Sequence, residues 1–329
     1  MANIQKQFEE FHKLIRIDYE MSATLREKRD IILNRIHSYL IKNGLPNFKR
    51  VSQGSYKMKT GVVPIEDLEY DIDVGLCFPF AESDHTAKEV RKWVFEAVKG
   101  HTETVEEKGP CIRVTYTDGY HVDLVMYACW PDGFGEAQFS LAHKTRGWVP
   151  ANPIKLIQHV NNAREVYEDT EDNATKTDQF RRCTRDLRRW NDVAIPYEDR
   201  GKPTGLALVL LAIKHLQPVV TWDGKSDDRL ALERMAWAAA NTVGRINAEK
   251  PTPEHEDMFG RLSDKQMDEL KERFRVLHKT LVDADTEKDP RKACQLLVEV
   301  FGDDFPVPPE EETAERTRGP AIITTSTSA

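Results

Sequence analysis

The spacing of the apolar residues changes near residue 153, and this change limits the fold more than any other feature of the sequence. Before it, β-type runs at 48–54, 70–78 and 111–130 are mixed with helical segments. After it, five segments show only the spacing of amphipathic helices: 153–168, 177–193, 204–216, 227–246 and 262–284. The sequence therefore predicts a mixed α/β first half and a helical second half.

Two local signals define the first half further. Residues 22–46 predict a long amphipathic helix that starts at a capping Ser22 and stops at Gly44. Asp118 and Gly119 separate two β-type runs, and this dipeptide accepts the positive φ of a tight hairpin. We therefore expect a β-hairpin at this point.

Length and charge narrow the class of protein. The chain has 329 residues, 40% of them hydrophobic, and a net charge of −8. This length predicts two lobes or two closely packed domains, and an acidic balance argues against a large nucleic-acid footprint because phosphates attract basic surfaces. No apolar run of about 18 residues is present and the N-terminal residues lack the plan of a secretion signal, so we expect a cytoplasmic protein without a membrane span.

The five cysteines carry no metal-site signature. They lie far apart, without C-x-x-C spacing, at Cys77, Cys111, Cys129, Cys183 and Cys294. We expect reduced core thiols rather than zinc ligands or a disulfide framework.

An unusual pair of acids lies on the apolar run "YDIDVGLCF". Side chains alternate along a strand, so Asp71 and Asp73 share one face while the residues between and after them face the core. Like charges held this close favour cations between them, and Mg²⁺ prefers hard oxygen ligands together with phosphates. Asp123, inside the apolar run "HVDLVMY", is the candidate third acid.

A candidate phosphate cradle precedes the acid pair. Gly54 and Ser55 follow the run "FKRVS", where a turn lets backbone N–H groups and a hydroxyl surround phosphate oxygens. A Gly-Ser turn, a D-x-D pair and a distant aspartate together predict two-metal phosphoryl or nucleotidyl transfer.

The pattern "GSYKMKT", "EYDIDVGL" and "HVDLV" resembles the nucleotidyltransferase superfamily, and "GWVPANP", "RRCTRDLRRWND" and "PTPEHEDMFGRLS" resemble bacterial CD-NTases of CBASS anti-phage systems. The resemblance implies an α+β, bilobal fold: a mixed-sheet, Pol β-like nucleotidyltransferase core packed on a C-terminal helical lobe, with a long N-terminal helix. The implied domains are residues 1–152, the nucleotidyltransferase core with the N-terminal helix; 153–307, the helical lobe that closes the cleft; and 308–329, a flexible tail.

The resemblance also implies residue roles. Asp71, Asp73 and Asp123 are the expected catalytic residues and ligands of two Mg²⁺ ions, or of Mn²⁺. The expected substrate-binding residues are Gly54, Ser55, Arg188 and Thr204. Arg188 stands where the family has a lysine and Thr204 where it has a serine, so the phosphate geometry is expected to differ.

The implied function is synthesis of a cyclic di- or trinucleotide second messenger, purine-containing and cGAMP-like, from ATP and GTP in anti-phage defence. Implied partners are an E1/E2-like CBASS ligase acting on Ala329 and an effector that senses the cyclic nucleotide. Two alternatives stay open: a template-independent RNA-tailing or linear-oligonucleotide polymerase, and an inactive nucleotide-binding sensor. The sequence does not determine the bases, the ring size, the linkage or how activity is switched on.

Overall fold

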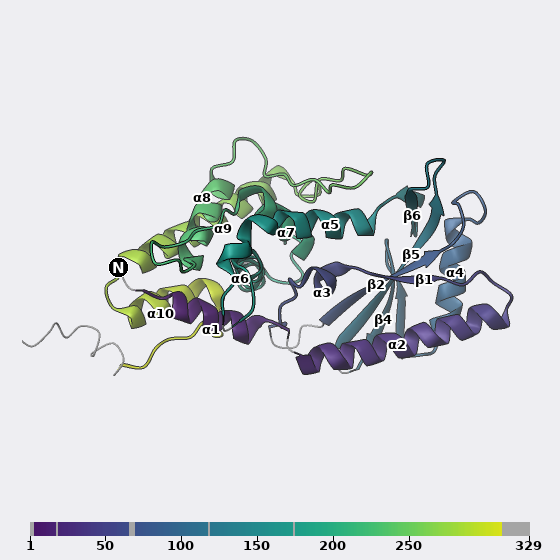
Figure 1. Cartoon of the computed structure of the whole chain (residues 1–329), viewed down its shortest axis with the longest axis horizontal. Helices are drawn as coiled ribbons and strands as arrows, with labels where there is room; N and C mark the ends of the chain where they lie inside the picture. The colour runs from purple at the N-terminus through teal and green to yellow at the C-terminus, as the bar shows by residue number, and fades with distance from the viewer. Residues whose placement is uncertain (1–2, 18, 66–69, 118, 174, 311–329) are drawn as a thin grey trace, which may run out of the picture.

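A mixed β-sheet and a bundle of helices lie side by side in the computed structural model (Figure 1), which confirms the expected α+β fold with a mixed sheet and C-terminal helices. The structure describes residues 3–17, 19–65, 70–117, 119–173 and 175–310, without the side chains of 19–22, 24–25 and 70–71. Ala329 and the tail beyond residue 310 lie outside the described residues. Within the described part, no helix is long and apolar enough to cross a bilayer.

The sheet is built around its longest strand, β5 (Tyr120–Pro131). The other strands are β1 (Lys49–Ser52), β2 (Tyr70–Phe78), β3 (Thr104–Glu107), β4 (Ile112–Tyr116), β6 (Ala137–His143) and β7 (Gly147–Pro150). Their order is β1-β2-β5-β4-β3, with β6 between β5 and β7. Only β2 and β5 pair in parallel, and the remaining pairs are antiparallel. The hairpin between β4 and β5 is confirmed, with Gly119 at φ +78°.

Two helices cover one face of the sheet. They are α2 (Tyr19–Lys42), which runs along the sheet in Figure 1, and α4 (Ala87–Val98). The apolar stripe of α2 packs with the inward side chains of β2, Ile72 and Val74, which are buried as expected from strand alternation. The long helix is confirmed, but it begins at Tyr19 rather than at a capping Ser22, because helical backbone continues through the preceding turn.

The helical part contains seven further α-helices and one 3₁₀ helix in the described residues. Their bounds are α1 (Gln5–Ile15), α5 (Pro153–Ala163), η1 (Glu165–Thr170), α6 (Gln179–Ala194), α7 (Gly205–His215), α8 (Asp228–Ala240), α9 (Asp264–Thr286) and α10 (Pro290–Phe301). Although α1 is N-terminal, Phe8 and Phe11 pack edge-on and tilted against Phe301 and Phe305 in the core of this part. Helix α1 and residues 301–305 are therefore packed together, although they are far apart in the sequence. The sequence patterns missed α10, β3, β6 and β7.

Candidate active site

The parallel pairing of β2 with β5 brings two of the three expected acids together. Asp73 lies directly opposite Asp123 in the register of the two strands. Odd-numbered residues of β2 face away from the core formed by Ile72 and Val74, so Asp73 projects on the face opposite α2 and α4. The two acids thus lie on neighbouring strands at one level of the sheet.

Asp71 lies one pleat earlier on the same strand. Its backbone pairs with His121, and its side chain lies outside the described residues. The period of two in a strand gives Asp71 and Asp73 the same face, but the position of the Asp71 carboxylate stays a prediction.

The backbone of Gly54 lies against the side chain of Asp73. It starts α3 (Gly54–Met58) with φ +70°, a conformation that favours glycine. A Cβ at this position would lie 2.0 Å from Asp73 Oδ2, closer than any real contact. The turn of Gly54 and Ser55 therefore lies against the Asp73 carboxylate, and only a residue without a side chain fits.

Arg113 is a site residue that the sequence reasoning missed. Its Nε donates to Asp123 Oδ1 at 2.8 Å and its Nη2 to Oδ2 at 2.7 Å, in a bidentate pair across β4 and β5. Arg113 and Asp123 are each five residues from Asp118 in the predicted hairpin, so they lie opposite each other on the two paired strands. This count could have identified Arg113 from the sequence. The sequence reasoning treated Asp123 as unpaired, whereas its charge is compensated in this structure.

The ability of Asp73 and Asp123 to bind Mg²⁺ depends on the ion pair between Arg113 and Asp123. Among the described side chains, no group of three or more His, Cys, Asp or Glu is arranged to hold a metal ion. Asp73 and Asp123 supply the hard carboxylate oxygens that Mg²⁺ prefers. The two carboxylates can bind Mg²⁺ once Asp123 releases the Arg113 guanidinium.

A cavity of about 410 Å³ lies over Asp73, between the sheet and the helices. Gly54, Ser55 and Asp73 line it from the sheet side, and α5 and α7 line it from the helical side. Tyr127, four residues after Asp123 on the same face of β5, also lines it and donates its hydroxyl to Gln53 Oε1 at 2.9 Å. Burial, and secondarily Asp73, raise the pKa of the Tyr127 phenol, so this hydroxyl stays a donor at neutral pH.

Arg188 lines the cavity, as expected for a substrate-binding residue, whereas Thr204 caps a helix. Arg188 lines the cavity, and its Nη1 donates to the carbonyl of Thr60 at 2.5 Å. A Cβ on Gly205 would lie 3.0 Å from the guanidinium, so the glycine leaves room for it. Thr204 caps α7 by accepting from the Ala207 N–H at 3.2 Å, and it lines an adjoining cavity of about 720 Å³ that also touches Ser55 and Arg188.

Two other arginines of α6 bind residues 61–63, and a third pairs within the helical part. Arg185 donates to the carbonyl of Gly61 at 3.1 Å, and Arg189 donates to that of Val63 at 2.8 Å. Arg182 is fully buried in a two-point pair with Asp228, at 2.6 and 3.0 Å. The arginine run of this helix is therefore mainly a structural clamp, with Arg188 as the member that reaches the cavity.

The expectation of five reduced thiols is wrong for one pair. Cys77 and Cys129 form a disulfide with their Cα atoms 5.7 Å apart, because β2 and β5 are neighbours. The three free cysteines, Cys111, Cys183 and Cys294, are buried as expected. Burial, and next the Asp123 carboxylate, raise the pKa of the Cys111 thiol, so it stays neutral beside the acids.

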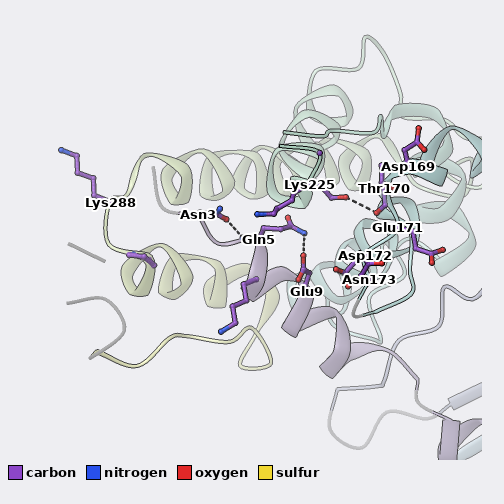
Figure 2. Close-up of a pocket in the computed structure, with 14 residues that line it drawn as sticks. Asn3, Gln5, Glu9, Asp169, Thr170, Glu171, Asp172, Asn173, Lys225 and Lys288 are labelled. Carbon is purple, nitrogen blue, oxygen red and sulfur yellow. Dashed lines mark hydrogen bonds between the residues drawn. The ribbon is translucent and has the colours of Figure 1, made fainter. Parts of the chain in front are cut away.

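Figure 2 shows a separate cavity of about 780 Å³ on the helical part, away from the acid pair. Gln5 and Glu9 of α1 point into it, and Gln5 Nε2 lies 3.4 Å from Glu9 Oε1. Burial, and next Asp172, raise the pKa of Glu9. None of the expected site residues lines this cavity.

The mixed sheet carries Asp73 and Asp123 opposite each other on β2 and β5, with the Gly54 turn against Asp73. Residues 47–127 match the family model described as "Cyclic GMP-AMP synthase DncV-like, nucleotidyltransferase domain". This chain therefore carries a DncV-like nucleotidyltransferase domain, which confirms the resemblance seen in the sequence.

Solved structures share the fold over nearly the full length. Vibrio cholerae DncV cyclic AMP-GMP synthase superposes with a TM-score of 0.74 at 15% identity, covering 93% of this chain and 98% of that chain. Escherichia coli DncV in its 3′-deoxy GTP bound form gives 0.70 at 15% identity, over 89% and 93%. E. coli MS115-1 CdnC with ATP gives 0.66 at 13% identity, over 92% and 98%.

Proposed function

We propose that this protein is a cyclic oligonucleotide synthase that joins nucleoside triphosphates, purine nucleotides among them, into a cyclic di- or trinucleotide. In each step a ribose hydroxyl loses its proton and attacks an α-phosphate, one O–P bond forms, and the bond to pyrophosphate breaks. Closing a ring of n nucleotides by this chemistry releases n pyrophosphates.

One observation carries the proposal: Asp73 lies opposite Asp123, with the Gly54 turn against Asp73, and both Gly54 and Asp73 line the cavity between the two parts. This arrangement puts carboxylates and backbone N–H groups beside one space large enough for a nucleotide.

The residues have distinct proposed roles. Asp71, Asp73 and Asp123 would hold Mg²⁺, which supplies charge neutralisation and hydroxyl activation when bound. Gly54 and Ser55 would orient the triphosphate, and Arg188 would contact it from α6. Thr204 retains its predicted phosphate contact only if its hydroxyl serves both the cap and the substrate, because it already accepts the Ala207 N–H.

The names of similar structures agree with this proposal. Vibrio cholerae DncV is described in complex with the linear intermediate 5′ pppA(3′,5′)pG, and separately with ATP and GTP. The same protein is described with nonhydrolyzable GTP. These complexes support ATP and GTP as the first nucleotides to test.

The test is turnover by the purified full chain with labelled ATP, GTP, CTP and UTP, singly and in pairs, with Mg²⁺. We expect pyrophosphate release and a phosphatase-resistant product. Asp73→Asn should lower the rate by at least about 10²-fold, because a ligand charge is lost where negative charge develops. The matched control is Asp268→Asn, a change of an exposed acid on α9, which should retain the wild-type rate.

The alternatives give different results in the same assay. Dependence on added RNA, or a phosphatase-sensitive product, would favour a tailing or linear polymerase. Nucleotide binding without pyrophosphate release would favour an inactive sensor. Turnover that is equal in Asp73→Asn and in wild type would contradict the proposed site.

The biological setting rests on the resemblance alone. A cytoplasmic role in anti-phage defence, an effector for the product and a ligase acting on Ala329 remain proposals. Mass spectrometry of the chain co-expressed with its neighbouring genes tests the last of these, and the absence of any adduct at Ala329 would exclude it.

A further inference from the structure

A braced loop at residues 249–257 lines one end of the 410 Å³ cavity. Glu249 and Asp257 form a bridge, and the Lys250 N–H donates to the Glu256 carbonyl at 3.0 Å. The loop residues that face the cavity are Lys250, Thr252 and Glu254. Because the backbone is tied at both ends, these side chains are held over the cavity rather than left on a free loop.

Glu254 is incompletely paired for a buried carboxylate. Its side chain is 17% exposed, and Oε2 is buried without a hydrogen-bond partner among the described residues. Oε1 lies 3.6 Å from Lys250 Nζ, and that ammonium also lies 2.6 Å from Glu256 Oε2. A buried acceptor without a donor is unfavourable, so a ligand that brings N–H groups would be stabilised here.

The position suits the base of a nucleotide. Tyr127 lies four residues beyond Asp123, about 13 Å along the strand. Burial does most to raise the pKa of its phenol, and the Asp73 and Glu254 carboxylates act in the same direction. Asp73 and Glu254 therefore both lie near Tyr127 and line the same cavity, so a nucleotide whose phosphates lie at Asp73 can place its base against Glu254. Apolar side chains line the cavity between the two ends, including Val125, Leu156 and Val209.

We propose that Glu254 and Lys250 read the Watson–Crick edge of a guanine, so that one of the nucleotides bound in this cavity is GTP. Guanine presents two adjacent donors, N1–H and the N2 amine, beside the O6 acceptor. A carboxylate accepts from both donors while an ammonium donates to O6. Adenine and cytosine place a ring-nitrogen acceptor beside a single amine, and a carboxylate repels that acceptor. The inference rests on the proposed function, because it requires the cavity to be the nucleotide site.

The test compares GTP with inosine triphosphate, which lacks only the N2 amine, by calorimetric titration of the full chain with Ca²⁺. Loss of a hydrogen bond to a charged group should weaken binding of inosine triphosphate at least about 10-fold. Glu254→Gln should bring the two affinities within about 3-fold, because an amide cannot accept from both donors. Glu256→Gln is the matched control: it also contacts Lys250 but does not line the cavity, so the wild-type ratio should persist.

Equal affinities of wild type for the two nucleotides would overturn the inference, as would an unchanged ratio in Glu254→Gln or no binding of either nucleotide. The wild-type comparison needs no variant to fold. Pyrophosphate release is measured separately. If the protein releases pyrophosphate but binds GTP and inosine triphosphate equally, guanine recognition by Glu254 is wrong and the proposed synthase activity stands. If the protein binds GTP more tightly than inosine triphosphate but releases no pyrophosphate, guanine recognition stands and the proposed synthase activity is wrong.

Discussion

Arg113 binds both carboxylate oxygens of Asp123 across two antiparallel strands, at 2.8 and 2.7 Å. The protein's own guanidinium therefore compensates one of the site charges. Metal binding at Asp123 requires this pair to open or to rearrange, which couples the stability of the sheet to the occupancy of the site.

Arg113→Met should lower the free energy of unfolding of the metal-free protein by about 2–4 kcal/mol, because it leaves a largely buried carboxylate uncompensated. Added Mg²⁺ should then raise the melting temperature of this variant more than that of wild type. Thermal melts with and without Mg²⁺ measure both effects. In the Arg113→Met/Asp123→Asn double variant, the cost should fall below the sum of the two single changes by at least about 1 kcal/mol, and simple additivity would contradict the coupling.

Gly54→Ala should reduce turnover at least about 100-fold, because the new Cβ would displace the Asp73 carboxylate that lies 2.0 Å away. The chain offers a matched control in Gly44, which has φ +63° but nothing within 4 Å of its Cβ position. Both substitutions should cost about 1 kcal/mol of stability from backbone strain, measured by denaturant unfolding. Only Gly54→Ala should lose activity, so equal turnover of the two variants would refute the close approach.

His12 should make stability fall in mild acid. Burial, followed by Arg185, Arg182, Arg16 and Lys13, lowers the pKa of His12 to about 2. Between that value and the unfolded pKa of about 6.5, the unfolded chain binds a proton that the folded chain does not. Stability therefore rises with pH up to about 6.5 and is lost below it.

The measurement is urea unfolding of wild type and His12→Gln at pH 7.5 and 5.5. Wild type should lose about 1.4 kcal/mol more than the variant over this range. Parallel losses in the two proteins would show that His12 does not carry this pH dependence.

The disulfide should be measurable as a difference in thiol count and stability. The denatured, unreduced protein should show three free thiols, and reduction should bring the count to five. Closing 52 residues of chain should add up to about 4 kcal/mol to the free energy of unfolding. The melting temperature of a Cys77→Ser/Cys129→Ser variant should not change when reductant is added. A large change in this variant would show that reductant acts on a group other than this disulfide.

Local patterns determined much of this protein from the sequence alone. The alternation of β2 put Asp73 on the face opposite Ile72 and Val74, and the hairpin at Gly119 followed from turn chemistry. Helices α5 to α9 of the second half followed from apolar spacing, whereas α10 did not. These features depend on neighbours within a few residues, which is why a single sequence reveals them.

Only the tertiary structure decided which distant residues meet. Parallel pairing of β2 with β5 put Asp73 opposite Asp123 and joined Cys77 to Cys129, although α4, β3 and β4 lie between these strands in the chain. Strand order is set by burial of the whole sheet and has no local signal. For the same reason the sequence did not show that α6 clamps residues 60–63 or that Glu254 faces the cavity, because each of these contacts joins segments more than a hundred residues apart.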